Sequence, residues 1–398
     1  MLPECNETPN LDTPVTSLLP AALAATLWFA SPTLDGVPDP GPTAPPPPSS
    51  EGVAGSAADP ILGAFTFSTW IQPLFEVRRW EDQESTVGFR LRRARLIVDA
   101  QGLDGRLRVR LMPDLASTPQ LRDAWVQLSG SAGWIRMGQQ TVPFSLQREV
   151  SMARGHFGDR ALASRRFELA GGRDVGVVAG SGALGDRIRV SAGAFNGRGS
   201  NRTEPSPSPL LSARTTLTLG ETRFNGETDL ARSPSPAVQL GAAVVGARDS
   251  FLRPRPGFAA DQTADWKGWT LDLLARYRGL SASAAWFGHD VRTPASASTT
   301  DGVQVEISGR GWHAGAGWML PADLTTPVGD VEVAVRHSRA RWDRDREGSA
   351  ERESAVGMTL FHRDHALQTR IQLSRERGML TGLSDASTRL TIEHQLFM

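Results

Sequence analysis

The sequence has one cysteine, one lysine and one tyrosine, and it contains no long apolar run. Cys5 is the single cysteine among 398 residues, which excludes an intramolecular disulfide and a cysteine-based metal cluster. No apolar stretch reaches the ~18 residues that a membrane-spanning helix needs. With 39% hydrophobic and 22% charged residues, the chain is too apolar for a disordered protein and too polar for a bundle of membrane helices. A soluble protein and a β-barrel both remain open on composition alone.

The net charge of zero hides an uneven distribution of charge along the chain. Residues 1–60 hold seven acidic residues and no basic one, so residues 61–398 carry a net charge of +7. Nearly all of the positive charge is arginine, because Lys267 is the only lysine. The segment 86–170 alone holds 14 arginines against seven acidic residues. Guanidinium groups stay charged and present a planar set of donors that suits oxyanions.

The first 60 residues predict an exported chain with a linker. Residues 18–30 form a short apolar stretch ending in small residues, as in a secretory signal, so we expect residues 1–30 to be a signal peptide. Acidic residues precede this stretch, where a signal has basic ones; a misplaced start codon and a disordered tail are therefore the alternatives. Residues 31–60 include PDPGPTAPPPPSS, which predicts an extended proline-rich linker. The folded part is expected over residues 61–398.

From Phe65 onward, apolar residues recur at every second position in short runs. In RLRVRL at 106–111, the arginines share one face and the aliphatic residues the other only if the run is a strand. About sixteen such runs follow one another, mostly separated by short turns and long loops in alternation. The connections 220–235 and 321–328 are longer than the short turns that this alternation predicts there. The pattern predicts an all-β, transmembrane antiparallel barrel of about 16 strands in the bacterial outer membrane, with a disordered N-terminal segment. A soluble β-sandwich is the alternative.

The run at 268–277 indicates which face of a strand meets lipid. Trp269, Leu271 and Tyr277 share one face, with aromatic rings at its ends, as expected for residues at the two interfaces of a bilayer. The other face carries Asp272 and Arg276, which a water-filled lumen would tolerate. We therefore expect the apolar faces to contact outer-membrane lipid and the polar faces to line the lumen.

Arginines dominate the predicted lumen face. A wall of low dielectric constant with charges of one sign concentrates counter-ions, so an arginine-lined lumen predicts the diffusion of small anions. The alternative is that lumen residues must be polar in any barrel, and acidic residues such as Glu332 and Glu393 support it. The residues assigned to the anion pathway are Arg90, Arg92, Arg106, Arg108, Arg110, Arg136, Arg187 and Arg189.

The connection 140–173 is too long for an ordinary loop, which suggests that it has a function. We expect it to fold inward and narrow the pore. An exposed surface loop is the alternative. The residues assigned to this constriction loop are Arg148, Arg154, Arg160, Arg165 and Arg166.

Four sequence motifs resemble the phosphate-selective porin O and P family. They are FRLRRARLIV at 89–98, IRMGQQTVPFSLQREVS at 135–151, GGRDVGVV at 171–178 and AGAFNGRGSNR at 192–202. The resemblance implies a sixteen-stranded outer-membrane channel, usually a homotrimer, that passes phosphate or polyphosphate. Members of the family use arginines and lysines near the constriction, whereas this chain has no lysine in that loop.

Other functions have weaker support in the sequence. The glycines of Gly180–Gly185 match a dinucleotide motif, but another strand follows instead of a helix, so they predict a hairpin turn. His362 and His365 flank a tight turn, so no metal or other cofactor is expected. The scattered histidines and the lack of a Gly-x-Ser-x-Gly motif argue against an enzyme. Nucleic-acid binding is not expected either, and a non-conducting structural or surface-binding barrel is the main rival.

Overall fold

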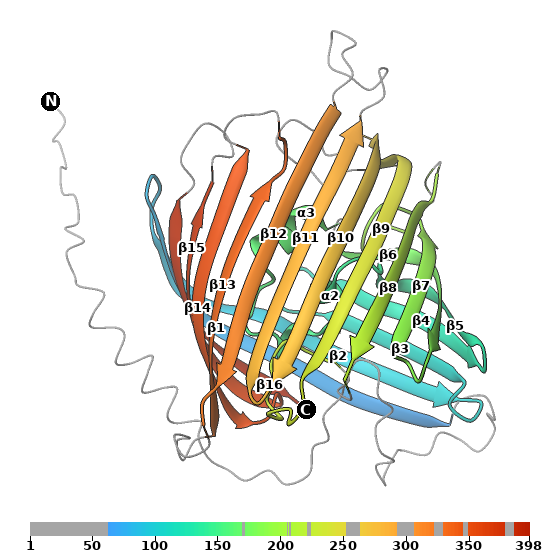
Figure 1. Cartoon of the computed structure of the whole chain (residues 1–398), viewed down its shortest axis with the longest axis horizontal. Coiled ribbons are helices and arrows are strands. Elements are labelled where there is room, and N and C mark those ends of the chain that lie inside the picture. The colour runs from blue at the N-terminus through green and yellow to red at the C-terminus, as the bar shows by residue number, and fades with distance from the viewer. Residues whose placement is uncertain are drawn as a thin grey trace, which may run out of the picture. The chain divides into compact units, whose positions relative to one another are not determined.

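A computed structural model describes residues 63–168, 172–204, 206, 208–220, 224–251, 263–292, 306–321, 329–344, 349–378 and 386–398. These residues form sixteen antiparallel strands that close into a barrel, in which β1 pairs with β16 (Figure 1). The prediction of an all-β barrel of about 16 strands is confirmed. The predicted signal peptide (1–30) and linker (31–60) lie outside the described residues. Among the helices that the structure describes, none is long and apolar enough to span a membrane.

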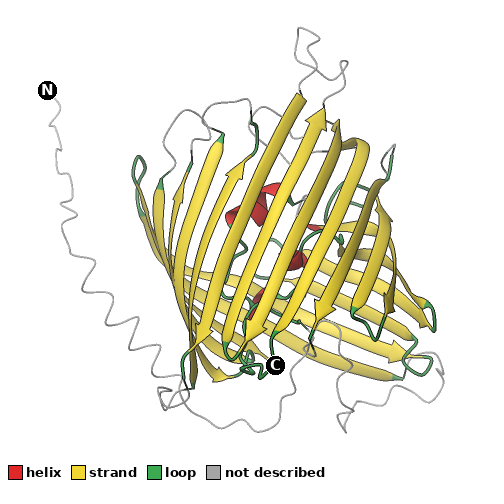
Figure 2. Cartoon of the chain, in the orientation of Figure 1, coloured by secondary structure: helices red, strands yellow, loops and turns green. Residues whose placement is uncertain are grey.

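Each strand coincides with one of the sixteen runs of alternating residues. The strands are β1 (Ala64–Trp80), β2 (Thr86–Gly102), β3 (Leu107–Asp114), β4 (Gln120–Gly130), β5 (Gly133–Thr141), β6 (Arg173–Ala183), β7 (Ile188–Phe195), β8 (Leu210–Leu219), β9 (Ala237–Phe251), β10 (Thr263–Tyr277), β11 (Leu280–Arg292), β12 (Glu306–Met319), β13 (Asp330–Arg341), β14 (Ala350–Arg363), β15 (Leu367–Arg377) and β16 (Ser387–Phe397). The β5–β6 connection contains three short helices: α2 (Leu146–Glu149), η2 (Met152–Arg154) and α3 (Leu162–Phe167). Figure 2 shows these helices within the ring of strands.

The two faces of the strands differ in exposure in the way that the alternation predicts. On β10, the side chain of Leu271 is 52% exposed on the outside of the barrel, whereas Thr270 and Asp272 are 1% and 4% exposed on the inside. Every backbone hydrogen bond in a closed barrel can be made between neighbouring strands, so no sheet edge is left unpaired. The barrel therefore presents an apolar outer surface and a polar interior.

A β-bulge changes which arginines of β2 point inward. Gln72 pairs with Arg93 but the next residue, Pro73, pairs with Leu91, so Arg92 is an extra residue in its strand. An extra residue interrupts the strict alternation of side chains. Arg92 lies 2.8 Å from Glu393 of β16, on the far side of the intervening strand β1, and Arg93 donates to the carbonyl oxygen of Gly158 at 3.4 Å. Adjacent arginines therefore share the inner face.

The β2–β3 and β6–β7 connections are tight turns at the end of the barrel where β1 begins and β16 ends. Residues 103–105 of the first turn and 184–186 of the second all have positive φ, with Gly105 at 81° and Gly185 at 66°. Glycine adopts this conformation without steric cost. The glycines of the dinucleotide-like motif therefore close a hairpin, as predicted. Arg106 and Arg187 belong to these turns and not to the strands, so their side chains are exposed at the rim.

Candidate functional site

The described residues of the β5–β6 connection, 142–168 and 172, lie inside the barrel and are called L3 below. Its apolar side chains join those of β6–β13 in one buried cluster that includes Phe144, Leu162 and Phe167 from L3 and Trp266 and Phe287 from the wall. The rings of Phe167 and Phe287 stack with their centroids 5.9 Å apart. Burial of these aromatic surfaces is the main force that can hold the loop against this side of the wall.

Long polar side chains of the wall satisfy the backbone of L3, which has few hydrogen bonds of its own. Arg214 donates to the carbonyl oxygen of Phe144 at 3.2 Å, and Arg370 to that of Gly155 at 3.0 Å. Arg336 donates to the carbonyl oxygen of Asp159 at 2.7 Å. Buried carbonyl groups need such partners, since each one left unpaired costs about 1–3 kcal/mol. The arginines of β8, β13 and β15 therefore hold the loop in place.

The arginines of L3 itself also act as anchors. Arg165 bonds to Glu353 of β14 at 2.8 Å and to Glu376 of β15 at 2.7 Å, and Arg166 bonds to Glu351 of β14 at 2.5 Å. Arg148 pairs with Glu168 within the loop. The Nε of Arg160 donates to the backbone of the loop at 2.5 Å, and Arg154 is buried. Carboxylates compensate Arg148, Arg165 and Arg166, which were assigned to the constriction loop, and that leaves them less available to bind an anion.

One carboxylate of L3 lies among arginines. Asp159 is 3.4 Å from Arg92 and 3.0 Å from Arg389. Burial alone would raise the pKa of Asp159, but these guanidinium groups hold its pKa well below the usual range. Asp159 therefore stays charged and ties L3 to β2 and β16.

The part of the inner wall that L3 covers least is formed by β2–β7 and is called the open wall below. Inner side chains of β8–β15 such as Arg214, Ser338 and Arg370 are buried, whereas Arg108, Arg110 and Arg136 of β3 and β5 are half-buried. Six of the eight arginines predicted to line the pathway lie on this open wall: Arg90, Arg92, Arg108, Arg110, Arg136 and Arg189. Arg106 and Arg187 differ from the expectation because the hairpin turns place them at the rim.

The open wall also holds arginines that the strict alternation did not predict. Arg93 and Arg95 point inward because of the bulge in β2, while Arg122 and Arg173 lie near strand ends. Arg95 pairs with Asp114 at 2.7 Å and Arg173 with Asp123 at 2.8 Å. The bulge could have been suspected from Pro73, since proline interrupts a strand except at edges and bulges.

Several arginines of the open wall lack an acidic partner. Among the residues that the structure describes, no carboxylate forms an ion pair with the following five: Arg93, Arg108, Arg122, Arg136 and Arg189. The guanidinium of Arg136 lies 4.2 Å from the ring of Trp125 and 4.9 Å from that of Trp134, which fixes its direction without neutralising it. The open wall therefore carries uncompensated positive charge, whereas Arg214, Arg336 and Arg370 of the covered wall each have a carboxylate partner.

A small cavity lies on this wall beside the β3–β4 connection. This is the end of the barrel opposite to the one where β1 begins and β16 ends. The cavity has a volume of about 250 Å³ and is lined by Arg92, Arg93, Arg95 and Arg122 together with Asp114 and uncharged residues of the β3–β4 connection. Arg92 and Arg95 have carboxylate partners, whereas Arg93 and Arg122 form no ion pair among the described residues. The cavity is a candidate site for an oxyanion, because planar guanidinium donors can bind two oxygen atoms at once. No metal site is formed by the histidines, cysteines and carboxylates within the described ranges.

A second segment, residues 224–236 of the β8–β9 connection, also folds into the barrel, from the end where β1 begins and β16 ends. Phe224, Glu227 and Asp229 are buried there. The backbone N–H of Glu227 donates to the carbonyl oxygen of Arg154 in L3 at 2.8 Å. The sequence showed only that this connection is longer than a normal turn, so its inward course was missed.

Ser281, His156 and Glu332 form a row like that of a serine hydrolase. The hydroxyl of Ser281 is 3.3 Å from Nε2 of His156, and Nδ1 of His156 is 3.0 Å from Glu332. Exposures of 4%, 2% and 1% leave the three side chains out of reach of a substrate. A nucleophile must be accessible to act. The row is better explained by its contacts, which join L3 to β11 and β13.

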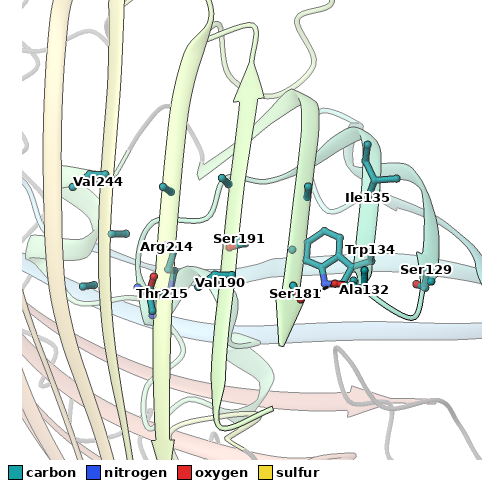
Figure 3. Close-up of a pocket in the computed structure, with 18 of the residues that line it drawn as sticks. Ser129, Ala132, Trp134, Ile135, Ser181, Val190, Ser191, Arg214, Thr215 and Val244 are labelled. Carbon is teal, nitrogen blue, oxygen red and sulfur yellow. Dashed lines mark hydrogen bonds between the residues drawn. The ribbon is translucent and has the colours of Figure 1, made fainter. Parts of the chain in front are cut away.

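A hollow of the barrel surface with a volume of about 1180 Å³ is not part of the lumen. It spans β4–β10 and is lined by apolar outward-facing residues that surround small ones (Figure 3). Its outward-facing residues Ile135, Val190 and Val244 are about half exposed. The hollow therefore belongs to the outer, apolar face.

Comparison with known sequences confirms the resemblance that the motifs predicted. The sequence model of the family described as phosphate-selective porin O and P matches residues 76–240. This range contains the strands of the open wall, L3 and the start of β9. Among curated protein sequences there is no match.

Solved structures with the same fold are porins and channels of Gram-negative outer membranes. The anion-selective porin of Comamonas acidovorans aligns with a TM-score of 0.59 and 13% identity, over 84% of this chain and 99% of that one. OprB of Pseudomonas putida aligns with a TM-score of 0.58 and 13% identity, over 84% of this chain and 94% of that one. The outer-membrane channel DcaP of Acinetobacter baumannii aligns with a TM-score of 0.55 and 12% identity, over 87% and 100%. The chain thus has the β-barrel fold of outer-membrane porins.

Proposed function

We propose that this outer-membrane barrel, which resembles the phosphate-selective porins O and P, is a channel through which small anions diffuse. The observation that carries the proposal is the difference between the two walls of the lumen. L3 covers the wall formed by β8–β15, where Arg214, Arg336 and Arg370 have carboxylate partners, more than the wall of β2–β7. On the less covered wall, five arginines form no ion pair with a carboxylate among the described residues. An anion that passes between L3 and the open wall meets positive charge along its route.

The pathway begins at the oxyanion cavity. In outer-membrane barrels the long loops are external and the short turns periplasmic, which places the cavity of Arg93, Arg95 and Arg122 at the external mouth. From there the route follows Arg110, Arg136 and Arg189 toward the periplasmic turns. Phosphate and polyphosphate, with several oxygen atoms, suit the cavity, and neighbouring arginines allow an ion to pass from one site to the next without tight binding at either.

The protein is expected to act as a homotrimer in contact with outer-membrane lipid. One solved structure of similar fold, OmpT of Vibrio cholerae, is described as a trimer form; it has a TM-score of 0.55 and 13% identity, with coverage of 84% of this chain and 100% of that one. The apolar outer surface, with Leu271 and Val244 about half exposed, suits lipid or a second copy. The family match and the fold favour a channel over an enzyme.

The rival function is a barrel that does not conduct and serves a structural or binding role. The inward course of both L3 and residues 224–236 favours it, because both segments occupy the lumen. Conductance separates the two functions.

The purified protein in planar bilayers is expected to form channels with a zero-current potential that shows anion preference in a gradient of potassium chloride. Inorganic phosphate, added on the external side, is expected to reduce the chloride current by competing for the arginines. The expected preference is larger at low salt, since salt screens the wall charges over ~8–10 Å. Absence of channels would support the non-conducting barrel, and channels with cation preference would contradict the arginine-lined pathway.

A further inference from the structure

His156 lies where L3, the β8–β9 connection and the barrel wall meet. Its Nδ1 is 3.0 Å from Glu332 of β13, and its Nε2 is 3.3 Å from the hydroxyl of Ser281 of β11. Its backbone N–H donates to Glu227 of the β8–β9 connection at 3.2 Å. Three elements that are distant in sequence therefore converge on this one residue of L3.

The surroundings of His156 are built to receive its ring. A Cβ on Gly317 of β12 would lie 2.5 Å from Cε1 of His156, so the ring occupies the space that the missing side chain leaves. His156 itself is 2% exposed. A buried, closely packed ring changes its position little while its contacts hold.

Glu227 of the β8–β9 connection binds L3 through both of its carboxylate oxygens. Its Oε1 accepts a hydrogen bond from Gln147 of L3 at 2.8 Å, and its Oε2 accepts the one from the backbone of His156. One carboxylate thus binds L3 at two points nine residues apart along the loop.

We propose that His156, when protonated, pins L3 to the wall and to the β8–β9 connection, so that its loss of a proton loosens L3 and makes the current through the channel unsteady. This inference rests on the proposed channel function and adds a form of regulation to it. The contacts of His156 lie on the covered side of the lumen. If they are lost, L3 can move toward the open arginine wall and narrow the passage.

The charges around His156 favour its protonated form. Two carboxylates face it, Glu332 from β13 and Glu227 from the β8–β9 connection, while the guanidinium of Arg276 from β10 opposes them. Burial alone would lower the pKa of His156, but the two carboxylates outweigh burial and Arg276, and its pKa is raised. The contribution of protonated His156 to holding L3 in place is complete below the ordinary histidine pKa of about 6.5. It is lost as the pH rises through the raised pKa of His156.

The test records single-channel currents of the full chain in planar bilayers between pH 5 and pH 9. The wild type is expected to conduct steadily at acidic pH and to show several-fold more frequent closures at alkaline pH. In Glu332→Gln the onset of closures moves to lower pH, since the carboxylate that raises the pKa is gone. In His156→Gln closures occur at every pH with no pH dependence.

His337 offers a matched control, because it is an exposed histidine on the outer face of β13 that contacts Ser354. His337→Gln is expected to keep the wild-type pH profile. Heat-modifiable migration on gels reports whether each variant has folded. Steady channels with the same pH profile in wild type and His156→Gln would refute the proposed role of His156 but leave the channel function intact. Absence of current in the wild type at every pH overturns both.

Discussion

Replacement of Arg108 and Arg110 by glutamate is expected to turn the anion preference of the channel into a cation preference. The double substitution changes the charge of the open wall by four units. At an effective dielectric constant near that of a protein surface, each unit within ~4 Å of an ion contributes up to about 4 kcal/mol before screening. Arg108 pairs in register with the inward-facing Gln127, and Arg110 is held toward the lumen by two hydrogen bonds to Asp99. The zero-current potential in a salt gradient should therefore change sign.

The turns provide a control with the same change in charge. Arg106 and Arg187 belong to hairpin turns and are exposed at the rim, so water and salt screen them. The double substitution Arg106→Glu and Arg187→Glu is expected to shift the potential much less. An equal shift in both double variants would mean that net charge, and not the position of the arginines on the open wall, controls selectivity.

Glu353→Ala is expected to destabilise the barrel by about 3–5 kcal/mol, because it leaves the buried guanidinium of Arg336 without an acidic partner. Glu353 is 1% exposed and bonds both to Arg336 of β13 at 2.7 Å and to Arg165 of L3 at 2.8 Å. The measurement is the free energy of unfolding from denaturant titrations in lipid vesicles. The variant should also conduct less steadily, since Arg165 anchors L3.

The exposed ion pair between Arg292 and Glu306, 3.0 Å apart, is the matched control for Glu353. Exposed pairs are worth about 0–1 kcal/mol, so Glu306→Ala should change the free energy of unfolding by no more than that. A similar small effect for Glu353→Ala would show that the covered wall does not hold L3 through buried charge.

The strands could be predicted because their signal is local. A strand that faces lipid on one side and water on the other must alternate, so each of the sixteen runs indicates its own strand without knowledge of its partners. The same rule predicted that Leu271 faces outward and Asp272 inward. The hairpin at Gly185 was also local, since positive φ angles at a turn favour glycine.

The site was only partly predictable because arginine has two uses in this barrel. Arg370 and Arg136 both lie on inward positions, yet one donates to the backbone of L3 and the other lies on the open wall. The difference depends on where L3 lies, and a loop with few backbone hydrogen bonds of its own has no periodic signal. Arg93 was missed because the bulge at Gln72 and Pro73 breaks the alternation.

The contact between L3 and residues 224–236 depends on three-dimensional packing alone. His156 and Glu227 are 71 residues apart and meet only in the closed barrel. The sequence signal was the length of the β8–β9 connection, which indicates a function but not a direction.

The proposed route of ions follows the open wall of β2–β7. It is tested most directly by cysteine modification during current recording, in a chain with Cys5 replaced by serine. A negatively charged, membrane-impermeant thiol reagent is added to Arg136→Cys, to its lipid-facing neighbour Met137→Cys, and to Gln372→Cys on the wall that L3 covers, where Gln372 is 2% exposed. The reagent is expected to lower the current only in Arg136→Cys, whereas a current that falls in Gln372→Cys and not in Arg136→Cys would contradict this route.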